Sequence, residues 1–465
     1  MASKTPQSWG RYPNVQAEQV VPLFWRNELP RLSDFAGSVL PYGYGRSYGD
    51  SCLNEGGIAL DATYLRRFIS FDEEQGLLRC EAGVSLADIL DEFVPRGWFL
   101  PVTPGTKFVS VGGAIANDVH GKNHHKAGTF GCHVTQFELL RSNGERLLCS
   151  PTENSELFRA TIGGFGLTGL ILWAEFRLKP IRSPYISVDH IRYNSLAEFM
   201  EIAADSDKNF EYTVAWCDCL KGGRYQGRGI FMRGNHEDSP EYTHKPLPKK
   251  LPLMVPFDFP SFSLNSLTVR AFNEVYYHMQ RQKHVHKVES YNPFFYPLDS
   301  VHNWNRIYGK RGFFQYQCVV PFDNGYEVMK EILDRIGRAK EGSFLVVLKE
   351  FGHITSPGML SFPRPGLTLA LDFSNHGQKT LRFLDDLDAL VLQSGGRVYP
   401  AKDARMSPES FQTYFPEWEA FAQYIDPKFS SSFWRRVTPE EAPTQKLKRL
   451  AATHTTQTAL SGNGR

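Results

Sequence analysis

The sequence predicts an α+β protein built from two domains. Its 465 residues are too many for one hydrophobic core, because single cores stop growing at roughly 250–300 residues. Residues 1–184 contain short strands joined by glycine-rich loops, whereas 185–396 alternate strands with amphipathic helices. The second pattern is typical of an antiparallel sheet covered by helices. Residues 397–437 are compact in composition, and the polar stretch 438–465 is expected to be a disordered tail.

Local signals predict the main elements in order. Ser85 can cap a helix with Asp88 at the capping-box position, and the Asn143-Gly144 turn predicts a β-hairpin. Ser407-Pro408 is predicted to begin a later helix. Strands are expected at 98–102, 134–140, 145–149, 170–178, 212–216, 314–320, 344–349 and 367–373, and helices near 156–161, 266–280, 324–339 and 377–394.

Composition and charge exclude several classes of protein. The 52 basic and 50 acidic residues give a net charge of +2, so no global field attracts nucleic acid. The first residues lack the apolar stretch of a signal peptide, and no run of 18 apolar residues predicts a membrane span. Seven cysteines, an odd number, are typical of reduced thiols. We therefore expect a cytoplasmic protein.

Three glycine-rich loops, at 43–49, 105–113 and 163–169, are the main candidates for ligand binding. Residues 164–169 match the G-x-G-x-x-G pattern, but a helix is expected before them and a strand after them, the reverse of a nicotinamide-binding Rossmann motif. Glycines let backbone amides approach an anion closely. The loops therefore favour a cradle for a pyrophosphate, with ordinary surface turns as the simpler alternative.

A cluster of histidines follows the second loop. His120, His124 and His125 would bind zinc only from a helix that presents two of them on one face, and Gly121 and Asn123 make that helix unfavourable. No metal site is therefore predicted. His120 is instead expected beside a cofactor, where it would donate a hydrogen bond or a charge.

These motifs together resemble a known superfamily. Arg46-Ser-Tyr-Gly-Asp50, Pro104-Gly-Thr106, Val111-Gly-Gly-Ala-Ile115, His120-Gly-Lys-Asn-His-His125 and Gly166-Leu-Thr-Gly169 are similar to the FAD domain of the vanillyl-alcohol oxidase/p-cresol methylhydroxylase (VAO/PCMH) superfamily. The resemblance runs from about 9 to 435 and includes 315–317, 361–363 and 401–403. It implies a PCMH-type FAD-binding domain at 1–184, an inserted substrate-binding domain at 185–396, and a return to the FAD-binding domain at 397–437.

The resemblance also implies how FAD is held. Many members of the superfamily attach FAD covalently to a histidine of the first loop, but Arg46 stands in that place here. We therefore expect non-covalent FAD, and a structural salt bridge is a second role open to Arg46. The residues expected to contact FAD are Pro41, Tyr42, Gly43, Tyr44, Gly45, Arg46, Ser47, Tyr48, Gly49, Asp50, Ser51, Gly105, Ser110, Val111, Gly112, Gly113, Asn117, Asp118, Val119, His120, Ile171 and Tyr399.

The implied activity is alcohol oxidation on a sugar. The most similar members oxidise the 2′-hydroxyl of a polyprenylphosphoryl-ribose, the first half of its epimerisation to polyprenylphosphoryl-arabinose for the cell envelope. Lys402 is our first candidate for a catalytic residue, because a desolvated lysine can act as a base. From its position alone, Lys402 would more simply pair with Asp403 on the surface. Tyr48 and His120 are second candidates. Lys349, Gln317, Gln315, Trp216, Phe295, Thr368, Ala370 and Lys402 are expected to line the substrate pocket.

Three pocket positions depart from those members. Ala370, Thr368 and Phe295 stand where those members have Cys, Asn and Tyr. A thiol-directed reagent should therefore find no target at 370. These changes leave the flavin chemistry intact but leave the exact sugar and lipid open.

The expected partners also come from the resemblance. A separate short-chain dehydrogenase/reductase would complete the epimerisation. The stretch 245–262 places Lys245, Lys249 and Lys250 beside Leu251, Leu253, Met254, Val255, Phe257 and Phe259, which suits a peripheral contact at the inner membrane face, a lid over a lipid tail, or a proline-rich loop. The rival functions are a soluble aldonolactone or alditol oxidase that uses O₂, and a flavin-binding protein without turnover.

Overall fold

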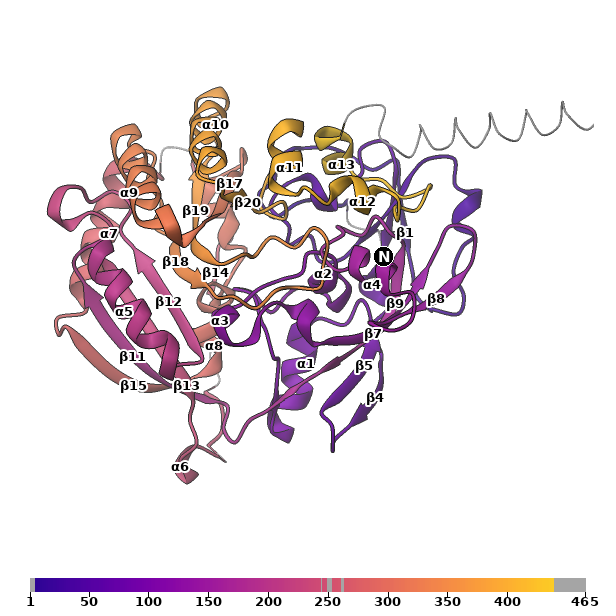
Figure 1. Ribbon diagram of the computed structural model, residues 1–465, viewed down its shortest axis with the longest axis horizontal. Coiled ribbons are helices and arrows are strands. Elements are labelled where there is room, and N and C mark those ends of the chain that lie inside the picture. The colour runs from indigo at the N-terminus through magenta and orange to yellow at the C-terminus, as the bar shows by residue number, and fades with distance from the viewer. Residues whose placement is uncertain (1–4, 244, 249–252, 261–262, 439–465) are drawn as a thin grey trace, which may run out of the picture.

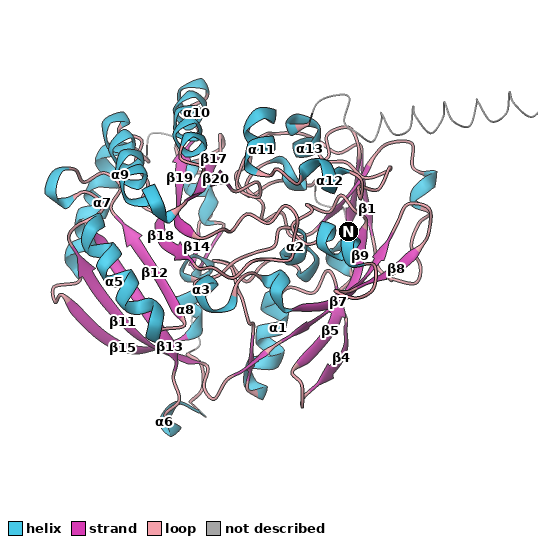
Figure 2. Cartoon of the chain, viewed as in Figure 1, coloured by secondary structure: helices cyan, strands magenta, loops and turns pink. Residues whose placement is uncertain are grey.

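The computed structural model describes residues 5–243, 245–248, 253–260 and 263–438 (Figures 1 and 2). Of the predicted tail, 439–465 lie outside the described residues. Figure 1 shows two main sheets side by side, the larger on the left and the smaller on the right. No helix among the described residues is long and apolar enough to cross a membrane.

The first 184 residues form the smaller sheets and their helices. A five-stranded antiparallel sheet has the order β4 (Phe68–Asp72), β5 (Leu77–Glu81), β9 (Leu170–Arg177), β7 (Val134–Leu140) and β8 (Arg146–Cys149). A parallel sheet has the order β1 (Gln19–Pro22), β3 (Ile58–Asp61) and β2 (Val39–Tyr42). The remaining elements are α1 (Leu86–Phe93), α2 (Val111–Ala116), α3 (His124–Ala127), α4 (Ser155–Thr161), and the pair β6 (Trp98–Phe99) and β10 (Lys179–Pro180).

Most local predictions for this half are confirmed. Ser85 and Asp88 form the capping box of α1, and β7 and β8 form the predicted hairpin. The G-x-G-x-x-G segment follows helix α4 and precedes strand β9, which excludes the Rossmann arrangement. The strand expected at 98–102 is shorter and comprises only Trp98–Phe99.

Residues from 185 onward form an eight-stranded, fully antiparallel sheet. Its order is β15 (His284–Ser290), β11 (Tyr185–Tyr193), β13 (Gly229–His236), β12 (Tyr212–Cys217), β18 (Val346–Phe351), β19 (Gly366–Ser374), β17 (Phe313–Val320) and β20 (Arg397–Val398). The other elements of this half are α6 (Pro240–Thr243), α8 (Tyr291–Phe295), and the parallel pair β14 (Leu253–Met254) and β16 (Val301–His302).

The two faces of this sheet have opposite roles because side chains alternate along each strand. On β17, Phe314, Tyr316 and Cys318 enter the largest hydrophobic core. That core is closed by α5 (Leu196–Asn209), α9 (Phe322–Ala339) and α10 (Gln378–Gln393). Gln315 and Gln317 face the other side and line a cavity. α7 (Ser266–Met279) packs on that second face, where Tyr277 joins Trp216 and Ile230 in a small cluster.

The chain then returns to its first half. Helices α11 (Pro408–Tyr414), α12 (Trp418–Ala422) and α13 (Ser432–Val437) follow the eight-stranded sheet, and Ser407 caps α11 as expected. Val39 of β2 makes two backbone hydrogen bonds to this segment. Its amide donates to the Lys428 carbonyl, and its carbonyl accepts from the Ser430 amide. The domain boundaries stay predictions, since β20 at 397–398 still belongs to the eight-stranded sheet.

Candidate active site

A cavity of about 620 Å³ lies between the glycine-rich loops and the open face of the eight-stranded sheet. This volume is typical of a site for a cofactor or small ligand. All three predicted loops contribute to its wall, with Gly43 and Gly45 from the first, Gly105, Gly112 and Gly113 from the second, and Gly166 and Gly169 from the third. Loops separated by 120 residues therefore converge on one space, which favours a ligand cradle over independent turns.

The first loop offers unsatisfied backbone donors to that cavity. Among the described residues, the amides of Tyr44, Gly45, Arg46 and Ser47 donate to no protein acceptor, although all four residues line the wall. Gly45 has a φ of 62°, the left-handed conformation that glycine adopts without strain. These residues are buried or half-buried, so their amides are available to a ligand with several acceptors, such as the pyrophosphate of FAD.

Arg46 is held by aromatic rings. Its guanidinium lies 4.0 Å from the centroid of the Trp9 ring and 5.6 Å from that of Phe108, and its Nε donates to the Phe108 carbonyl. No ion pair to Arg46 occurs within the described residues, so the salt bridge considered from the sequence is not formed there. Burial lowers the pKa of Arg46, but the group keeps its charge because an arginine pKa lies far above neutrality.

Lys402 lies in a tight turn at the cavity wall. Its amide donates to the Tyr399 carbonyl, and its Nζ lies 4.0 Å from the centroid of the Tyr48 ring. Nζ has no hydrogen bond or ion pair to any described residue. Burial lowers the pKa of Lys402 to about 8, although Asp372 opposes this by raising it. An amine with this pKa can accept a proton near neutral pH.

The simpler interpretation of Lys402, a surface pair with Asp403, is wrong. The Asp403 carboxylate instead accepts bonds from the amides of Arg405 and Met406 and pairs with Arg436 at 2.9 Å. Asp403 therefore shapes the turn while the Lys402 side chain remains available to the cavity.

The sheet contributes a polar wall opposite the loops. Gln315, Gln317, Lys349 and Trp216 line the cavity here, together with Ala370 and with Phe295 of α8, and their contact with substrate stays a prediction. Asp372 also lines it and was not predicted. Its carboxylate accepts from Gln315 at 2.7 Å and from the Tyr308 hydroxyl at 3.3 Å. Burial raises the pKa of Asp372 to about 7, so both of its protonation states are populated near neutral pH.

The model of an FAD binding domain matches residues 31–150 of the chain. Over 412 residues, the chain is 40% identical to the decaprenylphosphoryl-β-D-ribose oxidase of Mycolicibacterium smegmatis, with 86% of this chain and 89% of that enzyme covered. The chain belongs to the decaprenylphosphoryl-β-D-ribose oxidase family. It is an FAD-dependent oxidoreductase with the two-domain α+β fold of the VAO/PCMH type, as predicted.

Two further relatives show how the likeness is distributed. An uncharacterised Streptomyces coelicolor protein is 31% identical over its whole length and 76% of this chain. A Neurospora crassa protein named as a putative D-arabinono-1,4-lactone oxidase is 34% identical, but only over 30% of this chain and 25% of its own length. The likeness to the decaprenylphosphoryl-β-D-ribose oxidase family thus extends over the sheet wall, whereas the likeness to the lactone oxidase covers less than a third of the chain.

His120 joins the loops to the polar wall of this family member. Gln317 Nε2 lies 2.9 Å from His120 Nε2, and the ring packs between Phe351 and Tyr399. Burial and the neighbouring Lys349 hold the pKa of His120 well below its usual range. Burial therefore favours the neutral imidazole, which can exchange hydrogen bonds, and the role of His120 beside a cofactor stays a prediction.

Three lysines of one cavity share a lowered pKa. Burial lowers the pKa of Lys349 to about 7 and that of Lys122 to about 8, similar to Lys402. Lys349 Nζ donates to the Gly121 carbonyl at 2.8 Å. Lys122 was not predicted, although it stands within the 120–125 motif. Cations crowded in a buried space disfavour one another's charge, so an anionic ligand would stabilise all three.

Five predicted residues do not line the cavity. Gly49 packs on the Asp403 backbone, Asp50 pairs with Arg436, Val111 is in the hydrophobic core, Asp118 accepts from Ser361, and Thr368 lies behind Gln317. They support wall residues from behind. The other predicted contacts, Pro41, Tyr42, Ser51, Ser110, Asn117, Val119, Ile171 and Tyr399, all line the cavity, whereas His124 and His125 do not. The described residues contain no cluster of three or more potential metal ligands.

Proposed function

We propose that this protein oxidises the 2′-hydroxyl of a polyprenylphosphoryl-ribose to the 2′-keto sugar, the first half of epimerisation to polyprenylphosphoryl-arabinose. The observation that carries the proposal is one cavity lined both by the first loop, whose amides have no protein acceptor, and by Lys122, Lys349 and Lys402. The amides suit the cofactor, and the lysines suit a phosphate-bearing sugar. The name of the Mycolicibacterium smegmatis relative supplies the substrate class.

FAD supplies the hydride acceptor when it is bound. The amides of residues 44–47, together with Gly105, Ser110, Gly112 and Gly113, would hold it. We propose that it is bound non-covalently, because Arg46 is fixed between Trp9 and Phe108 in the place where a linking histidine would stand. Denaturation should release all flavin into the supernatant, and a protein mass increased by one FAD would contradict this.

Lys402 is proposed to accept the hydroxyl proton. Its Nζ is unpaired, and its pKa of about 8 leaves a useful fraction of free amine at neutral pH. Tyr48 cannot share this role, because burial raises its pKa well above its usual value. The face of the Tyr48 ring instead positions the amine of Lys402. The backbone amide of Tyr48 also donates to the Ala401 carbonyl beside Lys402.

The sugar and its phosphate are proposed to bind at the sheet wall. Gln317 and the neutral His120 are linked to each other and offer hydrogen-bonding groups for hydroxyls. Lys349 and Lys122 offer positive charge for the phosphate. Ala370 and Phe295 add apolar surface where the family members that it resembles most carry Cys and Tyr.

Anaerobic flavin reduction tests the function directly. The purified protein should be yellow, and polyprenylphosphoryl-ribose should bleach it, whereas free sugars and aldonolactones should not. Lys402→Ala should retain FAD but be reduced at least about 10²-fold more slowly. Lys126→Ala removes an exposed lysine of α3 that does not line the cavity and should behave like the wild type.

The results separate the rival functions. Faster bleaching by a free sugar or lactone would assign the protein to the soluble oxidases, and an FAD-bound protein that no sugar reduces would be a flavin-binding protein without turnover. Unchanged reduction of Lys402→Ala would remove Lys402 from the mechanism, and a folded protein that binds no FAD would overturn the proposal.

Two partners are proposed with this function. The keto sugar must be reduced on the opposite face to complete epimerisation, which suits a separate short-chain dehydrogenase/reductase. A site at the inner face of the cytoplasmic membrane stays a prediction. Of the stretch expected to contact lipid, Lys249, Lys250 and Leu251 lie outside the described residues, and Val255 is buried, whereas Leu253, Met254, Phe257 and Phe259 are exposed.

A further inference from the structure

Helix α7 buries a mixed apolar and polar side and leaves several large apolar residues exposed. Its buried residues are Val269, Asn273 and Tyr277. Asn273 donates to the Asp218 carboxylate at 3.0 Å, and the Tyr277 hydroxyl donates to Asn194 at 2.9 Å. A surface helix normally buries its apolar side and exposes its polar side. α7 departs from this pattern, because Leu267, Val275 and Met279 are exposed.

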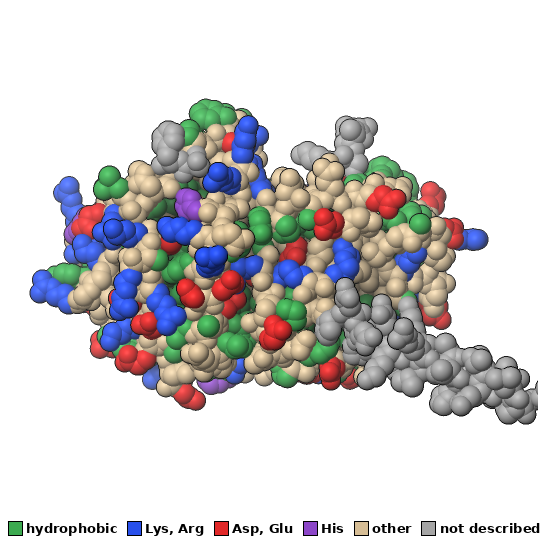
Figure 3. All heavy atoms as spheres, turned by 90° about the horizontal axis from the view of Figure 1, so that it is seen from above, with side chains coloured by type: hydrophobic (Ala, Val, Ile, Leu, Met, Phe, Trp, Pro, Cys, Tyr) green, Lys and Arg blue, Asp and Glu red, His purple; other side chains and the backbone are tan. Residues whose placement is uncertain are grey.

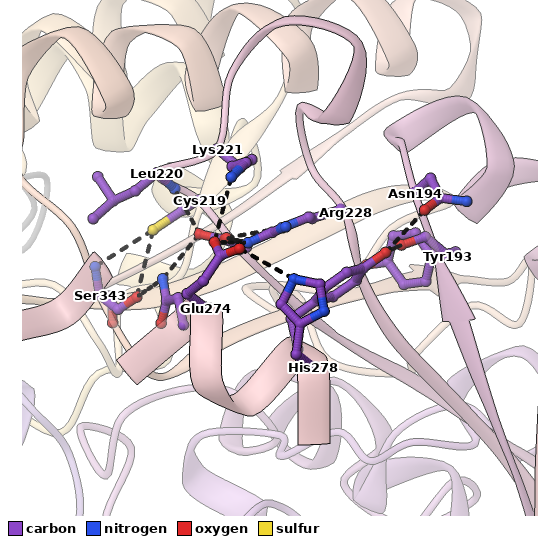
Figure 4. Close-up of polar contacts among 12 residues, drawn as sticks. Tyr193, Asn194, Cys219, Leu220, Lys221, Arg228, Glu274, His278 and Ser343 are labelled. Atoms are coloured by element: carbon purple, nitrogen blue, oxygen red, sulfur yellow. Dashed lines mark hydrogen bonds and ion pairs between the residues drawn. The ribbon is translucent and has the colours of Figure 1, made fainter. Parts of the chain in front are cut away.

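A charged network fixes this orientation (Figure 4). Arg228 is buried and pairs with Asp218 at 3.0 Å and with Glu274 of α7. Glu274 also pairs with Lys221 and accepts from His278 one turn later on the helix. Removing one member of such a network would leave a buried charge unpaired, which is costly. The helix is therefore held in this rotation and cannot easily turn its apolar stripe inward.

The outer side carries a continuous apolar stripe. Leu267, Ala271, Val275 and Met279 stand four residues apart, so they lie on one side of the helix. Leu267 is 75% exposed, Val275 62% and Met279 73%. The stripe is about 18 Å long at 1.5 Å per residue. Exposed apolar patches of this kind mark interaction surfaces.

The stripe flanks the entrance to the active site. Phe272 and Tyr276, on the adjoining side of α7, line the cavity, as do Val301 and His302 of β16. β16 pairs with β14, whose Leu253 and Met254 are 71% and 63% exposed. Eight of the fifteen large hydrophobic side chains exposed by the described residues fall between 253 and 279. About half of the exposed large hydrophobic side chains thus belong to α7, β14 and the segment between them.

The charge of this region favours an anionic surface. Residues 263–287 contain four Lys or Arg and one Glu. Glu274 is paired with Arg228, Lys283 with Glu198 and Lys287 with Glu289. Arg270 and Arg281 are exposed and have no ion pair among the described residues. In the view of Figure 3, Lys and Arg side chains gather over the half of the molecule that contains the eight-stranded sheet. Basic side chains beside an apolar stripe are typical of helices that lie on anionic lipid.

We propose that α7 and β14 form a membrane-docking surface that places the cavity entrance on an anionic bilayer. A single prenyl chain would need an enclosing groove, whereas three side chains of α7 that are more than 60% exposed form an open face that a lipid surface can cover. The inference deepens the proposed function, because a polyprenylphosphoryl sugar would then enter the cavity from the bilayer in which its tail remains.

Vesicle sedimentation of the FAD-loaded full chain tests the docking surface without any substrate. The wild type should sediment with phosphatidylcholine vesicles that contain phosphatidylglycerol, and less with phosphatidylcholine alone. Val275→Glu/Met279→Glu should weaken binding by about tenfold or more, since two exposed apolar groups become charged. Neither residue lines the cavity. Phe24→Glu, which changes a side chain exposed to 51% outside this region, is the matched control and should bind like the wild type.

Further measurements separate docking from catalysis. Flavin reduction by a water-soluble, short-chain phosphoribose should be equal in the wild type and the double variant, whereas reduction by substrate embedded in vesicles should fall. The proposal would be overturned if the wild type bound neither kind of vesicle, or if the double variant bound as tightly as the wild type. A wild-type dimer that the double variant dissociates would also overturn it, because a second copy would then cover the stripe. Failure of the proposed chemistry would leave vesicle binding unaffected.

Discussion

Lys402 and Asp372 form an electrostatic pair in the cavity wall. Burial alone would lower the pKa of the amine further, but the Asp372 carboxylate raises it and leaves it at about 8. In return, Lys402 lowers the pKa of Asp372, which burial has raised to about 7. The two groups are therefore coupled, and the ionised form of Asp372 favours the protonated form of Lys402. Because a base must be unprotonated, flavin reduction should increase as pH rises through about 8.

Asp372→Asn tests this coupling. Without the carboxylate, nothing opposes desolvation of the amine, so the pKa of Lys402 falls and the rising limb of the profile should move about one pH unit lower. Stopped-flow reduction under anaerobic conditions, measured across pH, gives the limb directly. Asp334→Asn, on the exposed side of α9, should leave it in place. If the rising limb of the pH profile were unchanged or moved to higher pH in Asp372→Asn, the assignment of Lys402 as the base would be contradicted.

Ala370 governs sensitivity to thiol reagents. Cys52 is the cysteine that lines the cavity within the described residues, and burial raises its pKa to about 12, which keeps it unreactive. A pocket-sized electrophile should therefore leave the cavity of the wild type unmodified, as peptide mapping would show, while Ala370→Cys should gain an adduct at 370. The exposed Cys132 serves as an internal control. Modification of the wild-type cavity would show that Cys52 is activated.

At the scale of elements, strand alternation predicts more of the site than individual residues do. In β19, Thr368, Ala370 and Asp372 alternate with Leu367, Leu369 and Leu371, which are all in the core. Thr368 and Ala370 were expected at the substrate pocket but Asp372 was not, although the same period of two extends to it. Thr368 shows the limit of that rule, because it shares the face yet lies behind Gln317. Only the packing decides which residues of a face reach the cavity.

The contact between the first loop and the 401–404 turn depends on a glycine. A Cβ atom at Gly49 would lie 1.6 Å from the Asp403 carbonyl oxygen, so Gly49→Ala must push the two segments apart. We expect a loss of about 1–3 kcal/mol in the free energy of unfolding and weaker FAD retention, measured by urea denaturation and by flavin release on gel filtration. Gly222→Ala, where a Cβ would meet nothing within 4 Å, is the control. Normal retention by Gly49→Ala would mean that the turn does not support the FAD loop.

At the scale of the molecule, the sequence predicts the two halves and their three loops because those signals are local. Glycine clusters, a capping box and alternating strands each span fewer than about 20 residues. The contacts that close the cavity are not local. Asp50 and Arg436 are 386 positions apart, and no short pattern links them. The pairing of Asp403 with Arg436 rather than Lys402 could not be predicted for the same reason.

Arg436 connects the C-terminal helix α13 to the first loop and to the 401–404 turn. It bonds Asp50 at 2.7 Å and Asp403 at 2.9 Å, and both carboxylates are buried. Arg436→Met keeps much of the side-chain volume but leaves two buried carboxylates without their cation. We expect the free energy of unfolding to fall by about 3 kcal/mol and FAD to be released at lower urea than in the wild type, as circular dichroism and flavin fluorescence would show.

Arg338→Met provides the matched comparison for that variant. Arg338 is 73% exposed and pairs with Asp334 one turn away on α9, so its loss should cost less than about 1 kcal/mol. Equal stability of the two variants would mean that the Asp50–Arg436–Asp403 contact does not join α13 to the loops. Arg436→Met could unfold at lower urea than the wild type and yet keep FAD until its own unfolding midpoint. The contact would then support the fold without shaping the cofactor site. Early release of FAD instead would show that the last helix of the chain holds the first loop against the turn of Lys402.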